Sequence, residues 1–225
     1  MVELREWAAD RPLFTLNEAE RALGIKRASL REKLSRLTDR GDLIRIERGK
    51  YTVHSEPLIY ATHIQTPSYL SLWSGLRWYD LTTQQPTRVQ VIASTTRDDL
   101  ESVEFFTSKT LFGFGKDRFE GFEIFVADPE RLLIDCLTRP QVSVAELGEL
   151  VSIVDIETTI HYADRYGTNA LKKRLGYLFE HGRGVVREEL KVEDRNYPIL
   201  DLARPADGPT DPAWRLRVNT DAVPG

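Results

Sequence analysis

The sequence is poor in the residue types that build disulfide frameworks and metal sites. It has one cysteine, Cys136, and four histidines among 225 residues. A single cysteine excludes an internal disulfide and is typical of a reducing compartment, so we expect a cytoplasmic protein. None of the histidines stands at a metal-ligand spacing such as His-x-x-x-His, and Cys136 has no second cysteine to pair with. We therefore expect no metal and no cofactor.

Long hydrophobic runs are also missing. The longest apolar stretches are a few residues long, as in Phe122–Ala127, where Glu123 interrupts the run. A helix that spans a bilayer needs about 20 apolar residues, so the sequence predicts no membrane segment. The residues Met1–Trp7 lack a basic region followed by an apolar one, so we expect no signal peptide.

The charges are unevenly distributed along the chain. The formal net charge is −4, yet residues 1–55 carry 12 Lys and Arg against 9 Asp and Glu, whereas the remainder carries 19 against 26. A basic unit attached to an acidic one suggests two functions. Ser55-Glu56-Pro57 is the candidate boundary between them. The predicted domains are 1–55 and 56–203, followed by a tail, 204–225, whose prolines and glycines predict an extended or flexible segment.

The first domain has the pattern of a helix-turn-helix. Val2–Asp10 is predicted to be a short amphipathic helix. The next helix is expected to be capped by Asn17, with Glu20 three residues later, and Gly24 suits the left-handed residue after its end. A third helix is predicted over residues 27–40. Its apolar stripe consists of Leu30, Leu34 and Leu37.

A hairpin follows directly after the third helix. Residues 43–46 and 50–53 are two short β-prone runs, and Glu47-Arg48-Gly49 between them suits a tight turn. Two helices joined by a short turn and followed by such a hairpin form a winged helix-turn-helix.

The polar face of this domain suits duplex DNA. Small or hydrogen-bonding side chains of the third helix point away from its leucine stripe, and cations flank them, so bases and phosphates can be contacted together. Hairpin cations would reach a neighbouring stretch of the DNA backbone. A winged helix used for protein contact would favour an acidic surface instead. The predicted DNA-binding residues are Lys26, Arg27, Ala28, Ser29, Arg31, Glu32, Lys33, Arg36, Arg45, Arg48 and Lys50.

The second domain mixes strands and helices. A helix is predicted over residues 67–79. Strands are predicted over 88–94, 103–107 and 122–127, with Gly113 and Gly115 marking a turn between the last two. Further helices are predicted over 129–137, 146–153, 157–166 and 169–181, the first of them capped by Asp128 with Pro129 at its first position. The expected fold class is α+β, with a winged helix-turn-helix followed by a mixed α/β domain that is largely helical towards its C-terminus.

No group of residues predicts a catalytic site. Asp128, Glu130 and Asp135 are close enough in sequence to suggest a metal-dependent nuclease. Helix capping by Asp128, the helix dipole at Glu130 and an exposed or capping Asp135 explain them more simply. Ser71 lies on a predicted helix rather than at a strand–helix elbow, so a serine nucleophile is not expected. Cys136 stands among leucines and is expected to be a core residue.

Several motifs resemble the AbiEi family of antitoxins. They stand in the family's order behind a winged helix, and the resemblance spans about Leu13 to His181. Two departures are that family members often have Ala where Gly75 stands and a His near Trp78–Asp80. The motifs are Tyr69–Leu76 (YLSLWSGL), Gln85-Pro86, Phe112-Gly113 and Val126–Asp135 (VADPERLLID).

This resemblance implies two activities. The first domain would bind inverted repeats in its own promoter and repress its operon. The second would neutralise a co-encoded nucleotidyltransferase-like toxin in the type IV manner, in which direct contact between the two proteins is not required. If the second domain does touch its partner, the candidate residues are Arg77, Trp78, Lys172, Lys173 and Arg174.

Two alternatives stay open at this stage. One is a stand-alone winged-helix transcriptional regulator whose second domain senses a small ligand or dimerises. The other is a DNA-directed nuclease that uses Asp128, Glu130 and Asp135.

Overall fold

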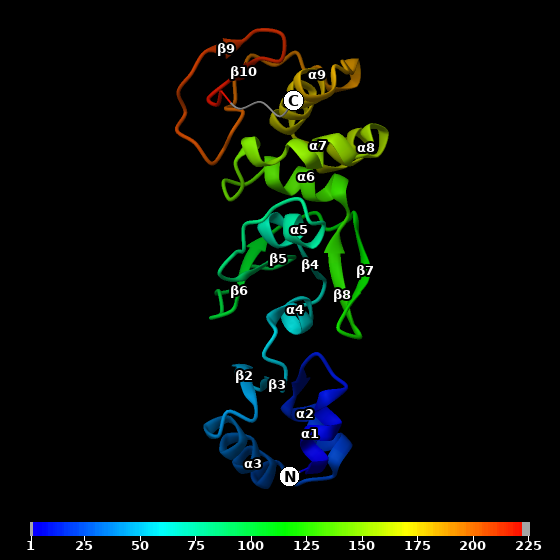
Figure 1. Cartoon of the computed structure of the whole chain (residues 1–225), viewed down its shortest axis with the longest axis vertical. Coiled ribbons are helices and arrows are strands. Elements are labelled where there is room, and N and C mark those ends of the chain that lie inside the picture. Colours follow the sequence, from blue (N-terminus) through cyan, green and yellow to red (C-terminus); the bar gives the residue numbers. More distant parts are fainter. Residues whose placement is uncertain (1, 222–225) are drawn as a thin grey trace. The chain divides into compact units, whose positions relative to one another are not determined.

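The computed structural model describes residues 2–221, and Figure 1 traces its elements. The chain forms two compact units. The first unit combines residues 2–70 with 87–109 and 116–125, and the second combines 71–86, 110–115 and 126–221. Residue 55, the predicted domain boundary, lies inside the first unit. Residues 222–225 of the predicted tail lie outside the described residues.

The first unit begins with the winged helix-turn-helix that the sequence predicts. Its helices are α1 (Val2–Ala9), α2 (Leu16–Leu23) and α3 (Arg27–Asp39), and its hairpin consists of β2 (Ile44–Glu47) and β3 (Lys50–Thr52) (Figure 1). A further strand, β1 (Phe14–Thr15), pairs antiparallel with β3, which gives a three-stranded sheet in the order β1-β3-β2. Two residues are too few to show a strand pattern, so β1 was not predicted.

The apolar stripe of α3 forms the centre of this winged helix. Leu30, Leu34 and Leu37 are buried, as predicted, and they pack with Leu4 and Phe14 from the preceding segments. The ring of Trp7 meets Phe14 edge-on at 5.2 Å between centroids. The leucine stripe therefore fixes which face of α3 remains available to a partner.

The predicted start of α2 needs a correction. Thr15, not Asn17, is the N-cap: its hydroxyl accepts from Glu18 N at 3.2 Å, and Glu18 Oε2 accepts from Thr15 N at 2.6 Å. This is a reciprocal capping box. Thr15 is held in an extended conformation because it pairs with Lys50 in β3, so the chain passes directly from strand to helix. The left-handed Gly24 after α2 is as predicted, with φ 63°.

A five-stranded sheet follows a short connection that contains α4 (Pro57–Tyr60) and the 3-10 turn η1 (Ala61–His63). The strand order is β6-β5-β4-β8-β7, with β4 antiparallel and β6 parallel to β5. The three predicted strands are confirmed as β5, β6 and β8. The five strands are β4 (Ser68–Leu70), β5 (Val89–Ala93), β6 (Val103–Thr107), β7 (Phe114–Phe119) and β8 (Phe122–Ala127).

Two local predictions in this region are wrong. The predicted helix over 67–79 is the strand β4 followed by a shorter helix, α5 (Leu72–Trp78). Residues Ser68–Leu70 are fully buried and pair with β5, and a short buried apolar run has no period that separates strand from helix. Gly115 lies within β7, and the turn before β8 is instead Glu120-Gly121, with φ 48° and 88°.

The second unit is mainly helical, as predicted. Asp128 caps α6 through Arg131 N at 2.9 Å, and all residues of α6 from Arg131 to Leu137 are buried. Helix α6 contacts α5, α7, α8 and α9, so it is the central helix of this unit (Figure 1). The helices are α6 (Pro129–Leu137), α7 (Gly148–Ile153), α8 (Ile156–Tyr166) and α9 (Asn169–Arg183), with the 3-10 turns η2 (Val144–Glu146) and η3 (Glu188–Leu190).

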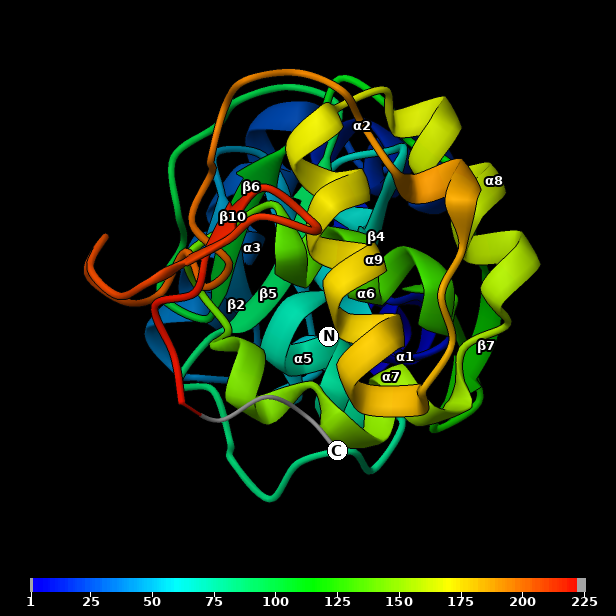
Figure 2. The ribbon, with the colours of Figure 1, turned by 90° about the horizontal axis from the view of Figure 1, so that it is seen from above.

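The predicted tail is exposed over residues 204–210, but its later part is packed around Trp214 and Leu216. Strands β9 (Thr210–Asp211) and β10 (Leu216–Arg217) pair antiparallel, and the segment runs beside α9 (Figure 2). Trp214 is 2% exposed, and its indole Nε1 donates to Glu180 of α9. Composition indicated a loose segment because it did not show that one tryptophan would anchor it.

Gly176 in α9 makes room for this tryptophan. A Cβ at position 176 would lie 2.0 Å from Trp214 Cζ3, and a rigid indole cannot yield. We expect Gly176→Ala to destabilise the protein by about 1–2 kcal/mol, because overpacking of about 1–3 kcal/mol exceeds the helix-propensity gain of about 1 kcal/mol. Urea unfolding measures this change. In a Trp214→Ala background the same substitution should become stabilising, and an unchanged sign there would contradict the packing argument.

Candidate nucleic-acid interface

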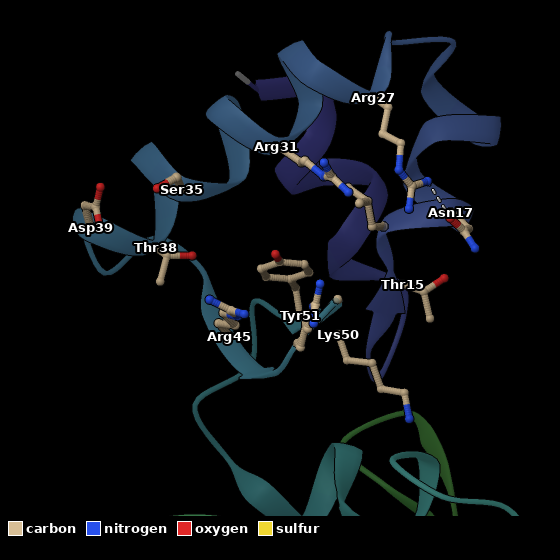
Figure 3. A pocket seen from close by; sticks show the side chains of 13 residues that line it. Thr15, Asn17, Arg27, Arg31, Ser35, Thr38, Asp39, Arg45, Lys50 and Tyr51 are labelled. Atoms are coloured by element: carbon tan, nitrogen blue, oxygen red, sulfur yellow. Dashed lines mark hydrogen bonds between the residues drawn. The ribbon is translucent and has the colours of Figure 1, made fainter.

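The face of α3 beside its leucine stripe and the β2–β3 hairpin enclose an open groove of about 810 Å³ (Figure 3). We call it the α3–hairpin groove. One wall carries Arg27, Arg31, Ser35 and Thr38 of α3, and the other carries Arg45, Arg48 and Tyr51 of the hairpin. Thr15, Leu16 and Asn17 at the start of α2, together with Asp39, Gly49 and Lys50, complete the lining.

Arg27 has a structural task in this groove. Its Nη1 donates to Asn17 Oδ1 at 2.7 Å and to Glu20 Oε2 at 2.8 Å, so it ties the start of α3 to α2. The turn of the helix-turn-helix is thereby held by side chains as well as by the apolar core. Part of the positive charge of Arg27 is already balanced by Glu20.

Three other arginines of the groove are free to bind an anion. Arg31, Arg45 and Arg48 are exposed, and none has an ion-pair partner among residues 2–221. They come from two separate elements and face the same open space, in which Figure 3 shows Arg31 and Arg45. Planar guanidinium groups bind phosphate oxygens in a bidentate manner. This arrangement suits an extended polyanion that lies between helix and hairpin.

A bulge in β2 separates the hairpin residues that face the groove from those that point away from it. The strand register shifts between Arg45, which pairs with Tyr51, and Glu47, which pairs with Lys50. Neighbouring residues on a strand point to opposite faces, so the side chains of Tyr51 and Lys50 point in opposite directions. Because of the bulge, Arg45 points to the same face as its partner Tyr51, and Glu47 points to the same face as its partner Lys50. Arg45 and Tyr51 face the groove.

The side chain of Lys50 points away from the groove, although its position lies on the rim (Figure 3). Its ammonium donates to the carbonyl of Ile64 and forms an ion pair with Glu47 at 2.9 Å. The structure therefore places this predicted DNA-binding residue at a protein contact. The alternation of β3 places Lys50 and Tyr51 on opposite faces, but only the tertiary structure shows which of the two faces the groove.

The remaining predicted residues lie outside the groove. Lys33 is half-buried, and Arg36 forms an exposed ion pair with Glu32 at 2.9 Å. These positions follow the outer and far sides of α3. The exposed residues of this group are Lys26, Ala28, Ser29, Glu32 and Arg36.

Sequence reasoning did not single out several groove residues. Thr15, Asn17, Thr38 and Tyr51 line the groove but were not among the predicted contacts. The hydroxyl of Thr38 donates to Leu34 O at 3.0 Å within the helix. Tyr51 stacks on Phe14 at 5.9 Å between centroids, so the core positions its ring at the groove. In the sequence, the alternation of Tyr51 with Thr52 along a short strand was the one signal that could have indicated that Tyr51 faces away from the core.

In the second unit, two of the three basic residues at 172–174 that were candidates for a partner contact are buried. Lys173 is 1% exposed and pairs with Asp194, and it donates to Asn196 O at 2.6 Å. Hydrogen bonds from Lys173 and Asn169 lower the pKa of Asp194 to about 2. These contacts make Lys173 a buried anchor for the segment after α9.

Arg174 is also buried, and burial lowers its pKa to about 10. Its Nε donates to Ile199 O at 2.9 Å and its Nη1 to Leu137 O at 3.0 Å. Lys172 pairs with Asp164 at 2.5 Å on the surface. Arg77 is exposed and Trp78 half-buried at the end of α5.

The three acidic residues that suggested a nuclease, Asp128, Glu130 and Asp135, have separate partners. Asp128 caps α6 and accepts from the Tyr162 hydroxyl at 2.9 Å, and burial together with this hydrogen bond raises the pKa of Tyr162 to about 12. Glu130 Oε1 accepts from Asp155 N at 2.8 Å. Asp135 is neither exposed nor a cap, contrary to expectation: it is fully buried between Arg131 and Arg139. Cys136 is buried, as predicted.

The motifs of the second unit meet around this buried carboxylate. Ser71 Oγ donates to Asp135 Oδ2 at 3.0 Å, and the guanidinium of Arg131 lies 4.6 Å from the Phe112 ring centroid. A Cβ at Gly75 would lie 2.6 Å from Leu132 Cδ1, so α5 and α6 are in close contact there. These motif residues hold the unit together.

Within residues 2–221, no helix is both long and apolar enough to cross a membrane.

The comparisons with known proteins agree with this geometry. Residues 2–54 match the model of a family described as "Transcriptional regulator, AbiEi antitoxin". No curated protein matches the chain significantly. The fold is similar to the crystal structure of the RV2827C protein from Mycobacterium tuberculosis, with a TM-score of 0.65 and 16% identity over 95% of this chain and 88% of that chain. The amino-terminal residues 2–54 are therefore similar to the AbiEi family of antitoxins and transcriptional regulators, and this similarity supports a regulatory role.

Proposed function

We propose that this chain is a non-enzymatic repressor of its own operon and the antitoxin of a nucleotidyltransferase-like toxin, active in the cytoplasm. The observation that carries the DNA-binding part is the α3–hairpin groove, into which Arg31, Arg45 and Arg48 project without ion-pair partners among residues 2–221. The family description of residues 2–54 supports both parts.

In the proposed complex α3 enters the major groove of operator DNA. Its exposed side chains Ala28, Glu32 and Ser35 face base edges, where small and hydrogen-bonding groups read sequence. One DNA backbone then runs through the α3–hairpin groove, between Arg31 on the helix and Arg45 and Arg48 on the hairpin. Lys50 has no part in this interface, because Ile64 and Glu47 hold its ammonium elsewhere.

The toxin-neutralising part rests on the second unit. Lys173 and Arg174 are buried and cannot contact a toxin. Among the earlier candidates, Arg77 stays exposed on α5 and Lys172 stays on the surface of α9 beside Asp164. These positions are where we would introduce substitutions first if the toxin and this chain bind directly.

DNA binding is tested with a labelled duplex that covers the region upstream of the chain's own gene. The control is a scrambled duplex of the same composition at physiological salt. We expect the upstream duplex to bind at least about 1000-fold more tightly, which is the lower end of specific recognition. Equal affinity for both duplexes would contradict operator recognition.

Toxin neutralisation is tested by growth. The adjacent reading frame is induced alone, with the full chain, and with the full chain carrying Arg31→Ala and Arg45→Ala. We expect both forms of the chain to restore growth, because neutralisation does not need the groove. A harmless reading frame, or toxicity that neither form relieves, would refute the antitoxin role and favour a regulator whose second unit senses a ligand or dimerises. Point variants serve better here than a cut at residue 55, which lies inside the first unit.

A further inference from the structure

The hairpin of the winged helix is braced by the five-stranded sheet of the same unit. The β2 bulge directs Glu47 to the face opposite the groove, the face to which Lys50 also points because it alternates with Tyr51 in β3. There Glu47 Oε2 accepts from Arg97 Nη2 at 2.6 Å, and Lys50 donates to Ile64 O. Arg97 belongs to the connection between β5 and β6, and Ile64 precedes β4. Two neighbouring residues of the hairpin are thus attached to two separate segments of the sheet region.

Arg97 is itself firmly held. Its side chain is 16% exposed, and its guanidinium lies 4.4 Å from the centroid of the Phe105 ring in β6. The ring fixes the plane of the guanidinium, which then meets the carboxylate of Glu47. Burial raises the pKa of Glu47, but hydrogen bonds from Lys50 and Arg97 outweigh it, and the net pKa lies below the usual value. The carboxylate is therefore ionised at neutral pH.

The same connection has a second attachment near Ile64. Gln65 Nε2 donates to Thr95 O at 3.2 Å, two residues before Arg97. The segments that receive Lys50 and Glu47 are therefore joined to each other. A hairpin of only nine residues, Ile44–Thr52, is marginally stable alone and depends on contacts with the rest of the protein for its orientation.

We propose that Arg97 is a positioning residue for DNA binding: through its ion pair with Glu47 it sets the hairpin so that Arg45 and Arg48 face the phosphates. This inference rests on the proposed DNA-binding function and deepens it. Arg97 does not touch the nucleic acid. Because Arg97 lies in the loop between β5 and β6, the sheet region of the first unit contributes to DNA binding in this proposal.

Glu47→Gln separates positioning from electrostatics by the sign of its effect. Electrostatics alone predicts tighter DNA binding, since a negative charge near the phosphates is removed. Positioning predicts that DNA binding weakens by about tenfold. It also predicts that the slope of log K against log[salt] falls in magnitude by about 1 to 2, because Arg45 and Arg48 no longer contact phosphates. Fluorescence anisotropy across a salt series measures both quantities on the full chain. Equal or tighter binding by Glu47→Gln would overturn the proposal.

Arg97→Gln tests the other partner of the ion pair. If Arg97 acts through Glu47, the double variant with Glu47→Gln binds no more weakly than either single variant. If Arg97 contacted a phosphate directly, the double variant would instead lose further affinity for DNA, and the magnitude of its salt slope would fall by about 0.9 more. Arg97→Lys keeps the charge and should recover part of the affinity. The matched control is Arg88→Gln, which removes ion pairs with Asp99 at 3.0 Å and Glu104 at 3.6 Å that do not involve the hairpin.

Hydrogen exchange keeps this inference distinct from the proposed function. In the free protein we expect amides of residues 44–52 to exchange faster in Glu47→Gln and Arg97→Gln than in the wild type and in Arg88→Gln. This readout needs no DNA, so it holds even if the operator is never bound. Unchanged exchange in both variants would refute the bracing role, whereas changed exchange in a chain that binds no DNA would refute only the proposed function.

Discussion

Replacing Arg31 and Arg45 together with alanine is expected to weaken operator binding by about 30- to 1000-fold, which corresponds to about 2–4 kcal/mol. The two arginines stand on opposite walls of the α3–hairpin groove, and neither has an ion-pair partner among residues 2–221. Their charges are therefore free to displace counterions from the DNA backbone. The magnitude of the salt slope should fall by about 2, since each phosphate contact contributes about 0.9.

The control for this prediction is Lys33→Ala with Arg36→Ala. That pair removes the same number of charges from positions of α3 outside the α3–hairpin groove, and Arg36 is already paired with Glu32. We expect a smaller loss of affinity and a smaller change in slope than for the groove pair. Binding that is unchanged by Arg31→Ala and Arg45→Ala, or that depends more on Lys33 and Arg36, would place the DNA backbone outside the α3–hairpin groove. Both variants should unfold at the wild-type temperature, because all four side chains lie outside the leucine core.

Replacing Asp135 with alanine is expected to lower the free energy of unfolding by about 3–5 kcal/mol, the range for breaking a buried ion pair. Asp135 Oδ1 accepts from Arg131 Nη2 at 3.0 Å and from Arg139 Nη1 at 3.1 Å, and Oδ2 accepts from Ser71 at 3.0 Å. Without the carboxylate the buried guanidinium of Arg131 loses its counter-charge. Ser71 also loses the contact that joins the start of α5 to α6. Urea unfolding followed by circular dichroism measures the change.

Asp164→Ala is the matched control for this substitution. Asp164 lies on α8 of the same unit with a side chain that is 55% exposed, and its ion pair with Lys172 is on the surface. Surface pairs contribute about 0–1 kcal/mol, so this variant should remain close to the wild type. A loss below about 1 kcal/mol for Asp135→Ala would show that the buried network does not hold the unit together. The expected loss of stability would also give the Val126–Asp135 motif a structural role, so that no nuclease chemistry is needed to explain it.

The amino-acid sequence was sufficient for several features whose signal is local. The leucine stripe of α3, the hairpin that follows it, and the start of α6 at Asp128 and Pro129 all arise from residues within one or two turns of each other. Helical periodicity and capping act over three to four residues, so they can be recognised without knowledge of distant partners. The same holds for the basic character of residues 26–50.

Features that depend on distant partners were not predictable in this way. Lys173 and Arg174 look like solvated cations in the sequence, but Asp194, Asn196 O and Ile199 O lie more than twenty residues away and allow them to be buried. Burying a charge is unfavourable unless it is paired, so the outcome depends on those partners and not on the neighbours along α9.

The composition of the groove has the same origin. The sequence suggested the cations of the winged helix, but their sorting into groove and bracing residues follows from the β2 bulge and from the contacts of Glu47 and Lys50 with Arg97 and Ile64. A bulge shifts the side-chain alternation of a strand by one residue, and nothing in the local pattern predicts where it occurs. Tertiary pairing thus determines which arginines face the DNA.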